Sequence, residues 1–177
     1  MACDLTTGRA KGCFDIVAGV KAVYFSDDAM GAITYEADGV TVTTFAGTPE
    51  FFQYDLKGSA NTYTETITKD VNNGTSFFAQ ALAIQFPKMT KVMHKELKML
   101  VYSSPTVIIE DYNSQYFVMG LENGADVNGG TVVTGGAKGD FSGYTLTMAG
   151  EEKSPANFLV VDIPTTTATI SAVQESP

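Results

Sequence analysis

The chain has 177 residues, of which 44% are hydrophobic, and a formal net charge of −9 at pH 7. This length suits one domain with a sizeable core, and the hydropathy excludes a disordered chain. The acidic balance argues against binding nucleic acid through the outer surface, and no apolar run approaches the roughly 18 to 20 residues that span a bilayer.

Residues 1–20 are predicted to form an N-terminal arm, ahead of a single domain over residues 21–164. The arm has no continuous apolar segment, so we expect no export through the secretory route. Its two cysteines, Cys3 and Cys13, lie ten residues apart without a nearby histidine, which argues against a zinc site. Without export, a reduced pair is favoured over a disulfide.

The first half of the domain alternates apolar and polar residues, which predicts β-strands. Residues 21–26 form the first strand, and residues 32–35 and 40–45 form a pair that turns between them. Residues 51–57 and 62–70 are expected to form one ribbon, whose threonine-rich side meets water or a polar partner.

The stretch 74–86, GTSFFAQALAIQF, fits either a strand or a helix. As a strand it places Phe78, Leu82, Ile84 and Phe86 on one face together with Gln80. The Asn73-Gly74 pair before it is a typical hairpin turn and favours the strand.

One segment is predicted to be helical, over about residues 88–103. Pro87 is a favoured first-turn residue, and Pro105 ends the helix. An apolar stripe recurs at helical spacing, formed by Met89, Met93, Leu97, Leu100 and Val101. The opposite side carries Lys91, Lys95 and Lys98.

The charge is uneven along the chain. Residues 88–103 hold four lysines and one glutamate, a net charge of +3, which leaves −12 for the remainder. A basic face on an acidic body suits self-association, and the alternative is an ordinary solvated helix face.

The remaining predicted elements are strands separated by glycine-rich turns. They cover residues 106–112, 115–120, 131–134, 144–149 and 157–163. Residues 165–177 are small and polar and are expected to form a flexible tail. The predicted fold is therefore a mainly antiparallel β-sandwich or barrel with one packed α-helix.

A cluster of acidic residues between Ser104 and Val127 raises the question of a metal loop. The EF-hand spacing is missing, and residues 111–115 fit a hairpin turn in which Asp, Asn and Ser side chains bind their own backbone. The alternative is that Glu122, Asp126 and Asp140 gather at a sheet edge and hold a cation.

Catalytic residue types are few. His94 is the one histidine and lies beside the apolar stripe, so we expect a half-buried structural role. There is no G-x-S-x-G elbow and no Walker A motif. Tyr24, Tyr63 and Phe117 lack basic neighbours and fit a core or an interface better than base stacking. We expect a protein that is not an enzyme and that needs no cofactor.

Three blocks carry a resemblance to a known class of protein. They are GSANTYTETITKDVNNGTSFFAQALAIQF, HKELKMLVYSSPTVIIEDYNSQYFVMGLENGADV and GDFSGYTLTMAGEEKSPANFL, within roughly residues 59–159, with TTGRAKGCFD near the start. Together they resemble structural proteins of tailed bacteriophages, most of all tail tube proteins. None of the blocks is a catalytic motif.

The resemblance implies a small β-sandwich or barrel with one flanking helix. Copies would assemble into rings, commonly hexamers, that stack into a conduit for DNA, with sheets of neighbouring copies continuing into an inner barrel. The implied partners are the chain itself, other tail proteins and passing DNA, in the virion tail and, during assembly, in the host cytoplasm. No membrane is involved. The predicted self-assembly surface comprises Phe52, Tyr54, Tyr63, Ile67, Lys91, Lys95 and Lys98.

The resemblance also implies a role for the negative net charge of the chain. Six copies at −9 carry six times nine, or −54, and acids lining the bore would repel phosphates so that DNA slides. Two alternatives remain at this point: another virion protein, such as a connector ring or a head decoration, and a carbohydrate-binding β-sandwich. The carbohydrate-binding alternative is weakened because the chain contains no tryptophan, the usual stacking platform for sugars.

Overall fold

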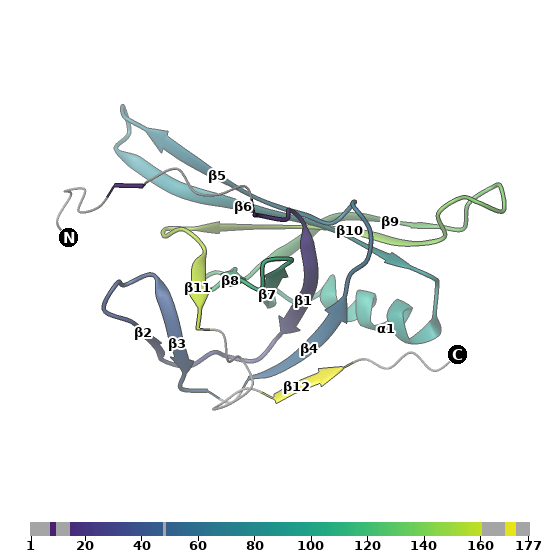
Figure 1. The fold of residues 1–177 in the computed structure, drawn as a ribbon, viewed down its shortest axis with the longest axis horizontal. Coiled ribbons are helices and arrows are strands. Elements are labelled where there is room, and N and C mark those ends of the chain that lie inside the picture. Colours follow the sequence, from purple (N-terminus) through teal and green to yellow (C-terminus); the bar gives the residue numbers. More distant parts are fainter. Residues whose placement is uncertain (1–7, 10–14, 48, 161–168, 173–177) are drawn as a thin grey trace.

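Two β-sheets and one α-helix make up the part of the chain that the structure describes. The structure is a computed structural model, and it describes residues 8–9, 15–47, 49–160 and 169–172 (Figure 1). The fold is mainly β and sandwich-like, which confirms the predicted fold class.

The larger sheet, sheet A, contains eight strands. Their order is β12 (Thr169–Ala172), β4 (Glu50–Asp55), β1 (Val20–Ser26), β7 (Thr106–Asp111), β8 (Tyr116–Met119), β11 (Asn157–Leu159), β3 (Thr41–Phe45) and β2 (Ile33–Tyr35). The smaller sheet, sheet B, is wholly antiparallel. Its order is β5 (Thr62–Asp70), β6 (Thr75–Pro87), β10 (Gly143–Glu152) and β9 (Asp126–Val133). The helix α1 (Lys91–Leu100) connects sheet B to sheet A.

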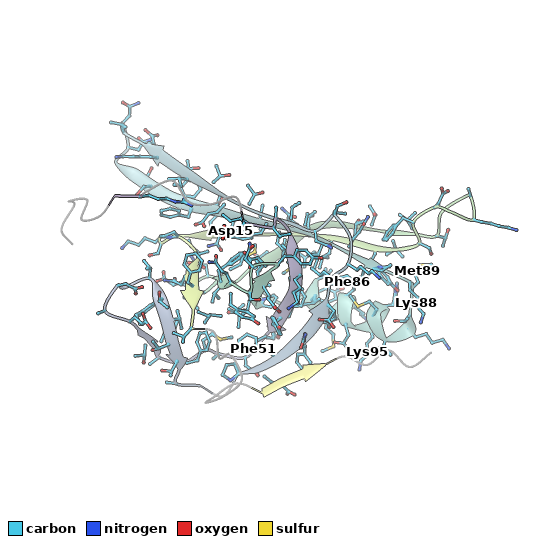
Figure 2. The ribbon with its side chains drawn as sticks, in the orientation of Figure 1. Asp15, Phe51, Phe86, Lys88, Met89 and Lys95 are labelled. Atoms are coloured by element: carbon cyan, nitrogen blue, oxygen red, sulfur yellow. The ribbon has the colours of Figure 1, made fainter. Side chains whose placement is uncertain are left out.

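The central strands of sheet A are buried on both faces. Val23 and Phe25 of β1 belong to a core that also contains residues of sheet B and α1, whereas Ala22 and Tyr24 belong to a second core on the opposite face. Phe86 lies in the first core and Phe51 in the second (Figure 2). Strands buried on both faces read as nearly continuous apolar runs, as residues 22–25 do.

The predicted ribbon of residues 51–70 is wrong, because its two halves lie in different sheets. The first half is β4, which pairs with β1 and β12, and the second is β5, which pairs with β6. Phe51 and Tyr54 on opposite faces of β4 are both buried, so β4 needs cover on two sides. Asn61 holds the crossing between the sheets: its Oδ1 accepts the backbone N–H of Gln85 at 2.9 Å.

The ambiguous stretch is a strand, as the preceding turn predicted. It forms β6 and directs Gln80, Leu82, Ile84 and Phe86 inward, where all four are buried. Buried Gln80 is matched across the core: its Oε1 accepts the backbone N–H of Gly120 at 3.0 Å. A satisfied polar bridge of this kind fixes how the two sheets meet.

The helix is shorter than predicted. It begins at Lys91, and the Oγ1 of its N-cap residue Thr90 accepts the backbone N–H of Met93 at 3.1 Å. Pro87 does not start the helix, because it is the last paired residue of β6, opposite Gly143. The chain then turns at Lys88, which has a φ of 70°. Of the predicted stripe, Met93 and Leu100 are buried and Val101 is 56% exposed.

Both ends of the predicted domain differ from the expected limits. Val20, assigned to the arm, is the first residue of β1, and residues 169–172 of the predicted flexible tail form β12, parallel to β4. Cys3, Cys13, residues 161–168 and residues 173–177 lie outside the described residues. The other predicted strands and the turn at residues 111–115 are present.

Candidate self-assembly surface

Sheet B covers one side of the molecule and extends beyond it in both directions. The β5–β6 hairpin projects at one end and the β9–β10 hairpin at the other (Figure 1). Among the described residues, no strand pairs with the outer edge of β5 or of β9. Each edge therefore presents unpaired backbone N–H and C=O groups that another chain can bind.

The outer face of sheet B is small and uncharged over most of its area. Side chains alternate between faces, and the register places mostly small residues outward: Thr62, Thr64, Thr66, Ala79, Ala81, Ala83, Thr145, Thr147, Ala149, Gly129 and Thr131. The larger outward side chains are Phe77, Gln85 and Val133. The outward positions of the four strands include no lysine or arginine. Their charged residues are Asp70, Asp126 and Glu151, and Asp126 accepts a hydrogen bond from Ser104 Oγ at 2.5 Å.

The inner face of sheet B exposes apolar side chains where the hairpins overhang. Ile67, near the end of β5, is 70% exposed, and Val71 in the adjacent turn is 82% exposed. At the other end Val132 of β9 is 55% exposed and lines a groove of about 380 Å³ together with Leu97 and Val101 of α1. The apolar side chains on the overhanging parts of both hairpins are thus exposed in the part of a single copy that the structure describes.

A second groove brings together four of the seven predicted surface residues. It has a volume of about 500 Å³ between α1 and β4, and its lining includes Phe52, Tyr54, Lys95 and Lys98. Lys91 is exposed on α1 outside this lining, and Ile67 lies on sheet B. The structure therefore does not gather the predicted residues on one continuous surface.

Two of the predicted surface residues belong mainly to the core. Tyr54 is 8% exposed, and its ring centroid lies 5.3 Å from that of Phe25 and 5.6 Å from that of Phe86. Tyr63 is half-buried with its ring centroid 4.9 Å from that of Phe117. Sequence alternation identified the face of each strand but did not show that this face is covered by the other sheet.

Within sheet A lies a buried polar cluster that the sequence did not reveal. Glu110 of β7 is 4% exposed, and its Oε1 lies 2.5 Å from Nζ of Lys21 while its Oε2 accepts from the hydroxyl of Tyr24 at 2.9 Å. The hydrogen bond and the charge of Glu110 raise the pKa of Lys21. The carboxylate of Glu110 on β7 thus binds two side chains of β1, one buried (Tyr24) and one half exposed (Lys21).

The acidic residues that suggested a cation site do not gather. Asp140 Oδ2 accepts the backbone N–H groups of Gly136 and Ala137, at 2.9 and 2.7 Å, and these bonds lower the pKa of that carboxyl. Asp126 is bound to Ser104. Over residues 8–9, 15–47, 49–160 and 169–172 there is no group of three ligand side chains that could hold a metal ion.

His94 is more exposed than expected, with its ring centroid 6.1 Å from that of Tyr144. It has no carboxylate or nucleophile as a hydrogen-bond partner among the described residues.

None of the helical structure in the described residues has the length and apolar character needed to cross a membrane.

Because the buried tyrosines have raised pKa values, we expect the free energy of unfolding to fall at alkaline pH. Burial raises the pKa of Tyr54 to about 12, and burial followed by neighbouring acids raises the pKa of Tyr24 and Tyr63 as well. Above a pH of about 10 the unfolded chain releases these protons while the folded chain retains them, so stability is present below pH 10 and falls as pH rises toward 12. Urea unfolding at pH 8, 10 and 11 measures this loss, and a flat profile would contradict it.

Tyr63 provides a second prediction, because its buried hydroxyl has no hydrogen-bond partner among the described residues. Tyr63→Phe removes a desolvated polar group and leaves the ring against Phe117, so we expect the free energy of unfolding to rise by about 1 kcal/mol. Chemical denaturation of both proteins measures the difference. A loss of stability would show that the hydroxyl is satisfied in solution.

Comparisons of the chain with models of protein families, with curated proteins and with solved structures gave no match.

Proposed function

We propose that this protein is a structural subunit of a bacteriophage tail tube, which assembles into rings, commonly hexameric, that stack into a conduit for DNA. The virion class comes from the resemblance of the sequence to tail tube proteins. The geometry of sheet B supports the assembly step.

The single observation that carries the proposal is the pair of open edges on a four-stranded antiparallel sheet. Because the number of strands is even, β5 and β9 run in opposite directions. A second copy related by rotation therefore places its β5 antiparallel to β9 of the first, and the alternation continues across the seam. Such head-to-tail contacts close into a ring when the rotation allows it.

The outer face of sheet B suits the wall of a bore. Threonine and alanine side chains make up most of this face, with Phe77, Gln85 and Val133 as its larger members, and its charged positions on the strands are acids. DNA phosphates would meet no lysine or arginine on this face, so they would find no cation to bind. The proposed sliding surface is thus mostly neutral, with few acids, instead of the strongly acidic wall that the net charge suggested.

Electron microscopy of the purified protein tests this function. A tail tube subunit should form long hollow cylinders, whereas a connector would stop at one ring and a head decoration would form neither. Cylinders whose bore is lined by another surface, such as α1 with its lysines, would contradict the assigned orientation of sheet B.

A further inference from the structure

The two open edges of sheet B are staggered along the strand direction. Through the ladders β5–β6 and β6–β10, Thr66 at the middle of β5 lies level with Glu151 of β10. Gly130, near the middle of β9, lies level with Leu146 of β10. The two midpoints are therefore 151 − 146, or five, residues apart across the four strands.

A repeating stagger of this size is what closure of a barrel requires. Side chains of one face must stay on one face across the seam, so the shift per copy has to be an even number of residues. Shifts of two, four and six residues over four strands correspond to strand tilts of about 19°, 35° and 46°. Closed barrels tilt by roughly 35–45°, which excludes two and leaves four or six.

The two remaining registers differ in which inner-face side chains lie opposite each other across the seam. With a shift of four, Val132 lies opposite Tyr63 of the next copy and Gly130 lies opposite Glu65. With a shift of six, exposed Val132 lies opposite the carboxylate-bearing Glu65 instead. An apolar side chain gains contact from an aromatic neighbour and none from a charged one, so the shift of four is favoured.

We infer that β9 of one copy pairs with β5 of the next in the register that sets Thr131 opposite Thr64 and Val132 opposite Tyr63. This inference rests on the proposed ring assembly. A shift of four over four strands makes the shear number equal to the strand number, as in the eight-stranded barrels that tilt by about 36°. Residues 129–133, which follow the bulge in β9, then pair fully with residues 62–66.

The outer-face threonines allow a direct test of the register. The backbone N–H of Thr131 donates to Thr145 Oγ1 on β10, at 3.1 Å, so the backbone polar groups of Thr131 point toward β10 and away from the free edge. At the seam with the next copy, Thr131 therefore occupies a non-hydrogen-bonded position. Residues opposite each other at such a position have Cα atoms about 4.5 Å apart, within disulfide range. Residues displaced by two lie about 7–8 Å away, beyond that range.

The experiment compares three matched double variants in a chain with Cys3→Ser and Cys13→Ser. Thr131→Cys is combined with Thr62→Cys, Thr64→Cys or Thr66→Cys, and mild oxidation of the assembled protein is followed by non-reducing electrophoresis. We expect a ladder of linked copies from the Thr64→Cys pair at least tenfold faster than from the other two.

Each result decides between the register and the function. Preferential linkage through Thr62→Cys or Thr66→Cys, or assembly without linkage in any pair, overturns the register while the ring proposal stands. Failure of the cysteine-free parent chain to assemble overturns the proposed function itself, and the register with it.

Discussion

Val132→Pro should leave a folded monomer under conditions in which the native chain forms rings. The N–H of Thr131 points toward β10, and successive N–H groups of a strand point to opposite edges, so the N–H of Val132 points to the free edge. Proline there removes the donor needed at every seam but no bond inside the sheet. The lost bond and the unmatched acceptor together weaken each contact by about 3 kcal/mol, or roughly a hundredfold.

Val132→Thr is the matched control, since it keeps the N–H and the branched shape. Size-exclusion chromatography with light scattering compares the masses of both variants, and circular dichroism checks that both remain folded. Rings formed by a folded Val132→Pro variant would show that the edge of β9 takes no part in assembly.

Glu110→Ala should lower the free energy of unfolding, because it removes a buried acceptor that joins β1 to β7. The substitution leaves the hydroxyl of Tyr24 without its acceptor and the ammonium of Lys21 without its counterion, in a site where Glu110 is 4% exposed. The side chain of Lys21 is 51% exposed and stays hydrated, so the cost comes from the buried Tyr24 hydroxyl, at about 1–3 kcal/mol for an unsatisfied polar group. Urea denaturation at pH 7 measures the change in the free energy of unfolding.

Glu110→Gln serves as the control for shape. Its amide oxygen can still accept from Tyr24, so it should lose less than half of what Glu110→Ala loses. Tyr24→Phe should fall between native protein and Glu110→Ala. A loss below about 1 kcal/mol for Glu110→Ala would mean that water reaches the carboxylate and that the cluster is not buried in solution.

Most strands could be predicted from the sequence, because side-chain alternation and turn residues are properties of neighbouring residues in the chain. The alternation in residues 75–87 and the Asn73-Gly74 turn gave β6 with the correct inner face, and the side-chain bonds of Asp111 explain the turn at residues 111–115. The helix was placed three residues early, since Pro87 is equally acceptable as the last residue of a strand that lies beside Gly143.

The candidate site depended on contacts that no local pattern encodes. Residues 51–57 and 62–70 alternate in the same way on either side of a short turn-like segment, yet β4 and β5 lie in different sheets because β4 is buried on both faces. Tyr54 and Tyr63 were both assigned to the self-assembly surface, with a core position as the other expectation for Tyr63, and the rings of both pack inside. The stagger of β5 against β9 arises from pairings between strands far apart in sequence, so only the structure reveals it.

A ring or tube of this protein requires one property, the association of identical copies through the edges of β5 and β9. Sedimentation velocity of the native chain over a hundredfold range of concentration measures it most directly. We predict that a fast-sedimenting ring or tube dominates at the upper end and that the Val132→Pro variant stays at the monomer value throughout. A native chain that remains a monomer over the whole range would contradict the account.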